Sequence, residues 1–154
     1  MAIKQQIDED IKKAMLAGDK TLATTLRGLK SAILYVEVEK GVKDTGLSEE
    51  DTLKVLAKEA KKRQESADLY EKGGDEARRN AELSEKQAIE KYLPEQMSEA
   101  EVAALIDNME AKLGGITQQN MGQAIGTVKQ QVGSSADGAL VARLVRERLG
   151  AGGN

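Results

Sequence analysis

The spacing of apolar residues is the feature that most constrains the fold of this chain. In the segment after Asp19, apolar side chains recur at alternating intervals of four and three residues, at Leu22, Leu26, Leu29, Ile33 and Val36. These intervals place them on one face of an α-helix. No segment shows the two-residue alternation of a half-buried β-strand. We therefore expect an all-α fold.

Capping and breaking residues divide the chain into the expected helices. Asp19, Ser48 and Ser98 each stand just before an apolar-periodic segment, where a side-chain oxygen can accept a hydrogen bond from a free helical N–H. Asn120 is expected to cap a further short helix. Pro94, the only proline, cannot continue a helix and is expected to end one.

These boundaries predict two domains. We expect four helices before Pro94, packed as an N-terminal four-helix bundle over residues 1–94. The remaining segment, residues 95–154, contains three apolar-periodic stretches separated by glycines. It is expected to form a small C-terminal domain of three helices.

Composition limits the chemistry that the chain can perform. Cysteine and histidine are both absent, which excludes disulfides, zinc–thiolate sites, thiol nucleophiles and the commonest general base. Only carboxylates, Lys, Tyr, Ser and Thr remain, and no catalytic residue, metal site or cofactor is predicted. Phe and Trp are also absent. Tyr35, Tyr70 and Tyr92 are expected in the core or at its boundary, with their hydroxyls in water.

Charge and hydropathy indicate a soluble, cytoplasmic protein. The 23 basic and 26 acidic residues nearly balance, so the chain as a whole is not a polyanion binder. No apolar run resembles a signal peptide or reaches the roughly 20 residues needed to span a membrane. No membrane partner is therefore expected.

Two glycines within a helical pattern require an explanation, because each interior glycine costs a helix about 1 kcal/mol relative to alanine. Gly122 and Gly126 lie four residues apart, on one helix face. The interpretation we favour is close packing of another helix inside the small domain. The alternatives are the approach of a ligand backbone, including that of a nucleic acid, and a phosphate-cradling loop. The loop is disfavoured because no strand precedes it.

Basic residues concentrate toward the C-terminus. Four of them are candidate phosphate contacts: Lys129, Arg143, Arg146 and Arg148. Arginines near a helix C-terminus also interact favourably with the helix dipole, so both interpretations stay open. A second candidate patch comprises Lys58, Lys62 and Arg63.

That second patch has a plainer alternative, a solvated helix face whose cations pair with acidic neighbours such as Glu59. Glu82 and Glu85 form a carboxylate pair one helical turn apart, which is a pattern used for acid–base chemistry or Mg²⁺ binding. Nothing in the sequence indicates a pocket around them. Salt bridges to Arg63, Lys86 or Arg78 are the favoured interpretation.

Four segments together resemble the YqeY or GatB/YqeY-like proteins. They are LRGLKSAI (26–33), the K..KR.ES..LY pattern (58–70), E..E....IEKYLPEQMSEAE (82–101) and MGQAIG...ADGALVARLV (121–145). The resemblance covers nearly the whole chain. Such proteins are similar to a stand-alone copy of the tail domain of GatB, a component of the tRNA-dependent aspartyl/glutamyl amidotransferase.

The resemblance implies an all-helical fold and a non-catalytic accessory role, in which the C-terminal domain binds tRNA or a tRNA–amidotransferase complex. Lys129, Arg143, Arg146 and Arg148 would then contact phosphates, and the two glycines would permit close approach. Family members are often labelled as glutamine-dependent carbon–nitrogen ligases, but no nucleophile or ATP site is evident here. A different class of function is a protein–protein adaptor, in which the face bearing Gly122 and Gly126 receives a partner helix.

Overall fold

A computed structural model describes the fold of residues 2–151 and the side chains of residues 2–149. Within this range the chain forms seven α-helices and one 3₁₀ turn, without a strand, so the predicted all-α class is confirmed. The helices are α1 (Ile3–Leu16), α2 (Lys20–Glu39), α3 (Glu49–Lys72), α4 (Glu76–Glu90), α5 (Glu99–Leu113), α6 (Met121–Val132) and α7 (Gly138–Ala151). Residues 152–154, included in the predicted C-terminal domain, lie outside the described range.

The chain divides into two compact units between Pro94 and Glu95. We refer to the unit before this boundary as the N-terminal unit and to the one after it as the C-terminal unit. The N-terminal unit contains α1 to α4, and the C-terminal unit contains α5 to α7 with the 3₁₀ turn Gly133–Ser135.

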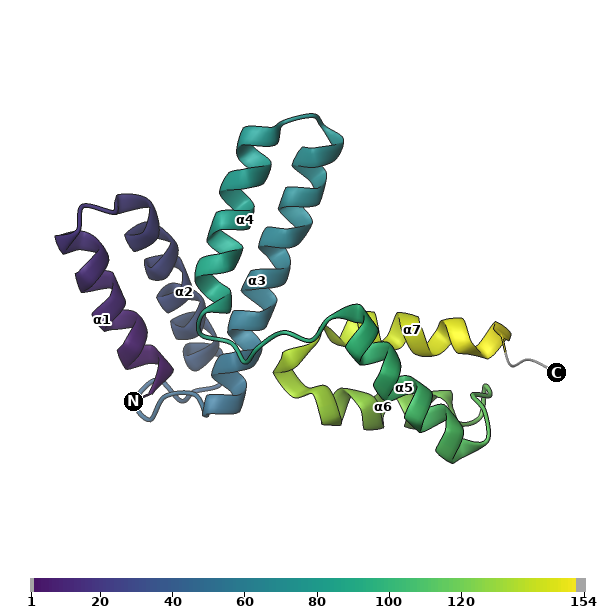
Figure 1. The fold of residues 1–154 in the computed structure, drawn as a ribbon. Helices are drawn as coiled ribbons and strands as arrows, with labels where there is room; N and C mark the ends of the chain where they lie inside the picture. Colours follow the sequence, from purple (N-terminus) through teal and green to yellow (C-terminus); the bar gives the residue numbers. More distant parts are fainter. Residues whose placement is uncertain (1, 152–154) are drawn as a thin grey trace. The chain divides into compact units, whose positions relative to one another are not determined.

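The N-terminal unit consists of two helical hairpins. Figure 1 shows that α1–α2 and α3–α4 diverge from one shared end, so the four helices do not run alongside one another over their full lengths as in a regular bundle. The core occupies the shared end, where every helix contributes at least one buried side chain: Ile7, Leu26, Leu29, Ile33, Leu56, Ala60 and Ile89. Burial of these aliphatic groups is the main force that holds the two hairpins together.

Three predicted helix caps are confirmed. The side chain of Asp19 accepts a hydrogen bond from the backbone N–H of Leu22 at 3.0 Å. In the same way Ser48 and Ser98 each accept a hydrogen bond, at 3.1 Å, from the backbone N–H of the residue three positions later. The predicted Asn120 cap is wrong. Asn120 precedes α6, but its side chain accepts a hydrogen bond from the backbone N–H of Thr117, which stabilises the preceding turn instead of the helix.

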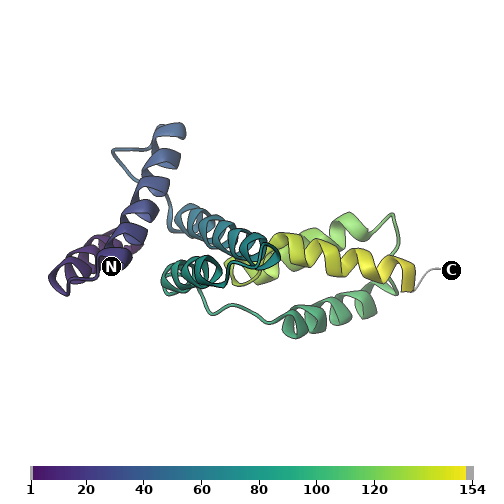
Figure 2. The same cartoon turned by 90° about the horizontal axis from the view of Figure 1, so that it is seen from above.

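The C-terminal unit packs three helices around an aliphatic core. Figure 2 shows α5, α6 and α7 grouped together, and each of the three helices contacts the other two. Each helix contributes buried aliphatic residues, and Ile116 from the α5–α6 loop joins them: Val102, Ile106, Ala124, Val128, Val132, Val141, Leu144 and Val145. The backbone N–H of Met97 donates to the carbonyl of Ser135 at 2.8 Å, which ties the start of the unit to its 3₁₀ turn.

The tyrosines have unequal environments. Tyr35 is 73% exposed, so its predicted place in the core or at its boundary is wrong. Tyr92 is half-buried, and its hydroxyl donates a hydrogen bond to Asp10, which connects the end of α4 to α1. Burial and the Asp10 carboxylate both raise the pKa of Tyr92. No helix in the described range is both long and apolar enough to cross a membrane.

Candidate nucleic-acid interface

The glycines of α6 face solvent. Gly122 and Gly126 lie at the helix surface, and a methyl group added to either would meet no atom within 4 Å. The favoured interpretation, close helix packing inside the small domain, is therefore wrong. The helix packs instead through Ala124, Val128 and Val132. The α6 backbone at the two glycines is open to an external molecule.

Arg143 lies on the surface of α7 between two carboxylates. Its guanidinium donates to Glu147, one turn further along the helix, at 2.8 Å and to Glu99 at the start of α5 at 3.1 Å. The hydrogen bonds to Glu99 and Glu147 raise the pKa of Arg143. Its positive charge is thus locally compensated, and its side chain connects α7 to α5.

Arg148, little more than one helical turn beyond Arg143 on α7, makes a denser set of contacts with α5. It forms ion pairs with Asp107 and with Glu110, the latter at 2.8 Å, and approaches the carbonyl of Ala103 at 3.4 Å. The side chain is only 24% exposed. The hydrogen bond to Glu110, supplemented by that to Asp107, raises the pKa of Arg148. This arginine has a structural role in fastening α7 to α5.

Lys129 and Arg146 differ from these two arginines. Both side chains are exposed, and within the described part of the chain neither forms an ion pair or a side-chain hydrogen bond. The side chain of Lys129 extends toward the start of α7, where its Cε would lie 3.1 Å from a Cβ added to Gly138. Among the described residues, the four predicted cations therefore fall into two kinds, two with acidic partners and two without.

Lys129 also shares the glycine face. It follows Gly126 by three residues and Gly122 by seven, so the three positions form one stripe along α6. An anion that approached the open backbone at the glycines would lie on the helix face that also bears Lys129, whose ammonium lies beside Gly138 at the start of α7. We call Gly122, Gly126 and Lys129 the α6 stripe.

The second predicted patch on α3 is largely neutralised. Lys62 pairs with Glu59 at 3.2 Å, and Arg63 pairs with Glu59 at 2.9 Å and with Glu85 of α4 at 3.0 Å. Burial lowers the pKa of Arg63, but the interactions with Glu59 and Glu85 outweigh it and raise the pKa overall. The predicted salt bridge between Glu85 and Arg63 is confirmed. Lys58 is exposed on the same helix.

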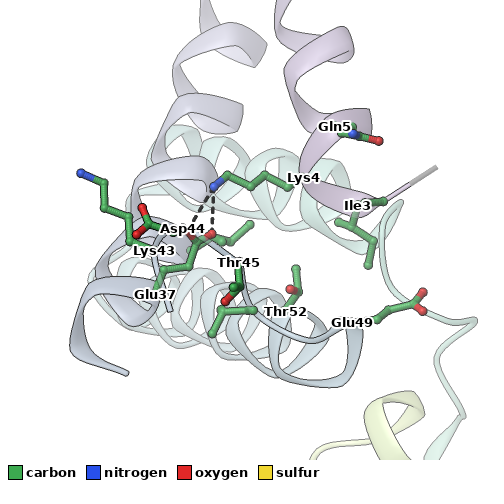
Figure 3. Close-up of a pocket in the computed structure, with 13 residues that line it drawn as sticks. Ile3, Lys4, Gln5, Glu37, Lys43, Asp44, Thr45, Glu49 and Thr52 are labelled. Carbon is green, nitrogen blue, oxygen red and sulfur yellow. Dashed lines mark hydrogen bonds and ion pairs between the residues drawn. The ribbon is translucent and has the colours of Figure 1, made fainter. Parts of the chain in front are cut away.

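A pocket in the N-terminal unit was not predicted. It has a volume of about 510 Å³ and lies between the start of α1, the C-terminal half of α2 and the loop over residues 43–47 (Figure 3). Lys4 donates to both carboxylate oxygens of Glu37, at 2.9 and 3.1 Å, and Glu37 is 1% exposed. The two residues are 33 positions apart, so no local pattern in the sequence signals their pairing. The described residues contain no cluster of three acidic side chains that would hold a metal ion.

Comparison with known proteins gives one family match. A family model described as Yqey-like protein matches residues 4–149, which is nearly the whole chain and includes both units. No curated protein matches the chain.

Proposed function

Because this chain belongs to the YqeY family, we propose that it is a non-catalytic accessory protein that binds tRNA, alone or in a complex with a tRNA-dependent amidotransferase. The C-terminal unit is the proposed binding unit. Its contacts are to the phosphate backbone, which supplies most of the sequence-independent affinity of proteins for nucleic acids.

The observation that carries this proposal is a pair of exposed cations, Lys129 and Arg146, that have no acidic partner among the described residues. A phosphate that binds either residue displaces only water and counterions. A phosphate that binds Arg143 or Arg148 has to compete with carboxylates already at hydrogen-bonding distance. Lys129 and Arg146 are therefore the principal proposed contacts, and Arg143 and Arg148 are secondary.

The α6 stripe adds a second element. A glycine has no side chain to hold a ligand away, so at Gly122 and Gly126 a nucleic-acid backbone can approach the helix more closely than at any other residue type. The open space in front of both glycines supports this use. It also explains why the chain tolerates the helix cost of about 1 kcal/mol for each glycine.

A salt titration tests the proposal. Binding of labelled bulk tRNA, with duplex DNA of similar length as the comparison, is measured by fluorescence anisotropy over a range of salt concentrations. Two phosphate contacts predict a slope of about −2 in a plot of log affinity against log salt, whereas four would give about −4. Absence of tRNA binding at low salt would refute the proposal.

Charge-reversal variants assign the contacts. Arg146→Glu and Lys129→Glu should each weaken tRNA binding and reduce the salt slope by about 1. Lys12→Glu is the matched control, because Lys12 is exposed on α1 and the substitution changes net charge equally. An equal loss with Lys12→Glu would show that the effect reflects overall charge and not these two residues.

A second candidate function is a protein–protein adaptor, favoured by the same open glycine face. Met121 and Ile125 are partly buried beside it and present some apolar surface to a partner helix. Substitution of Gly122 and Gly126 by Leu should then abolish capture of an amidotransferase subunit without changing the helical content of the protein. Retained capture by that variant would eliminate the adaptor role.

A further inference from the structure

Exposed apolar side chains gather on one face of α2. Leu34, Tyr35 and Val38 are 41%, 73% and 59% exposed. At 100° per residue they project on the side of the helix opposite to Leu29 and Ile33, which are buried in the core. Three large apolar residues in adjacent positions of one helix face are typical of an interaction surface.

The same face continues toward the helix N-terminus with small residues. Thr24, Gly28 and Ser31 are exposed on it, and a methyl group added to Gly28 would meet no atom within 4 Å. We call these six residues the α2 face. Large side chains project from its C-terminal half, whereas its N-terminal half carries only small residues.

We propose that the α2 face binds the α2 face of a second copy of this chain, with the two helices antiparallel and a two-fold axis close to Ser31. In this register Tyr35 of each copy lies over Gly28 of the other, and Val38 of each lies over Thr24 of the other. The large side chains of one α2 face thereby pack against the small residues of the other. Such a self-complementary surface forms a closed dimer.

Charge supports the antiparallel orientation. Lys20 and Arg27 lie toward the N-terminal end of the α2 face, and Glu39 lies at its C-terminal end. Within the described residues, Lys20 and Glu39 form no ion pair. An antiparallel dimer brings Lys20 of one helix toward Glu39 of the other, and also aligns the two helix dipoles favourably. A parallel dimer would place like charges together.

The complementarity of the face to itself, in both size and charge, identifies a second copy as the occupant. The contact is a single helix pair, which is smaller than most stable interfaces, so the dimer is expected to dissociate at low protein concentration. This inference concerns the N-terminal unit and does not depend on the proposed binding of tRNA by the C-terminal unit.

Sedimentation equilibrium over a wide concentration range tests the dimer. The intact chain should shift from monomer to dimer mass as concentration rises, and Tyr35→Lys with Val38→Lys should stay monomeric. Both substituted side chains are exposed, so the fold should be unaffected. Leu69→Lys is the matched control, because Leu69 is 67% exposed on α3 and should leave dimerisation intact. Monomer mass at every concentration would overturn the proposal.

Cysteine cross-linking tests the register, because the chain contains no cysteine of its own. Ser31→Cys lies at the proposed axis and should form a disulfide-linked dimer under mild oxidation. Thr24→Cys should not, since its two copies would be roughly 20 Å apart along the helices, beyond the reach of a disulfide. Equal cross-linking at both positions would overturn the antiparallel arrangement, and none at Ser31→Cys would overturn the pairing itself.

Discussion

Removing Lys4 should destabilise the N-terminal unit more than neutralising its partner Glu37. The Lys4 ammonium lies 2.9 Å from one oxygen of the Glu37 carboxylate, and Glu37 is 1% exposed. Lys4→Met keeps much of the aliphatic volume but leaves a buried carboxylate without its cation. Loss of one partner from a buried ion pair costs about 3–5 kcal/mol. Lys4 itself is 39% exposed, so water reaches the pair and we expect about 2–3 kcal/mol.

Glu37→Gln should have a smaller effect. The amide can still accept a hydrogen bond from Lys4, and the partly exposed ammonium can extend into water. Loss of a charged hydrogen bond under these conditions should cost about 1 kcal/mol. The double variant should cost less than the sum of the two single variants, because the residues interact directly.

Urea denaturation followed by tyrosine fluorescence measures these differences. The chain has no Trp, and Tyr35, Tyr70 and Tyr92 all precede Pro94, so the signal reports on the N-terminal unit alone. The midpoint should fall most for Lys4→Met with an unchanged slope. The reasoning is refuted if Glu37→Gln is the more destabilising change, or if the effects of the single variants add fully in the double variant.

Three further predictions concern stability and ionisation. Gly122→Ala with Gly126→Ala should stabilise α6, by up to about 1 kcal/mol for each substitution, since the added methyl groups meet no atom; slower amide hydrogen exchange in α6 would confirm this, and faster exchange would contradict it. Tyr92→Phe should remove the most basic component from the absorbance titration of the tyrosines, because burial and Asp10 raise the pKa of Tyr92. Since the pKa of Tyr92 is higher in the folded state than in the unfolded state, its contribution to the free energy of unfolding is complete below the pKa of an unfolded tyrosine and decreases as the pH rises above that value. In alkaline solution the stability of the wild type should therefore depend more on pH than that of Tyr92→Phe. Arg148→Met should lower the free energy of unfolding of the C-terminal unit by about 1 kcal/mol, measured by thermal denaturation. An effect that is larger at high salt than at low salt would argue against an electrostatic cause.

The parts of the fold that sequence reasoning predicted correctly rest on short-range signals. Asp19, Ser48 and Ser98 cap helices through hydrogen bonds to residues three positions away, so each cap is contained in four consecutive residues. Asn120 fits the same pattern, but its side chain accepts a hydrogen bond from the backbone N–H of Thr117, three residues earlier in the chain. Where two local partners compete, the sequence pattern does not decide between them.

The candidate site depends on contacts between distant residues, which periodicity does not reveal. Arg143 and Glu99 are 44 positions apart, so their ion pair follows only from the packing of α7 against α5. The spacing of Gly122 and Gly126 predicts that they share a face but not whether another helix covers it. For the same reason, the sequence did not distinguish Lys129 and Arg146 from the arginines that already have acidic partners.

The divergence of the two hairpins has a consequence for local motion. Figure 1 shows the turn between α3 and α4 extending away from α1 and α2. The core residues Leu56 and Ala60 lie in the first half of α3 and Ile89 lies at the end of α4, so all three are distant from this turn along the helices. Beyond the core, each turn of α3 is protected mainly by the adjacent turn of α4, so these amides should open stepwise without unfolding of the core. Proteolysis should therefore begin near Gly73 and Gly74, and the hairpin tip should exchange its amide protons before any other helical segment of the N-terminal unit.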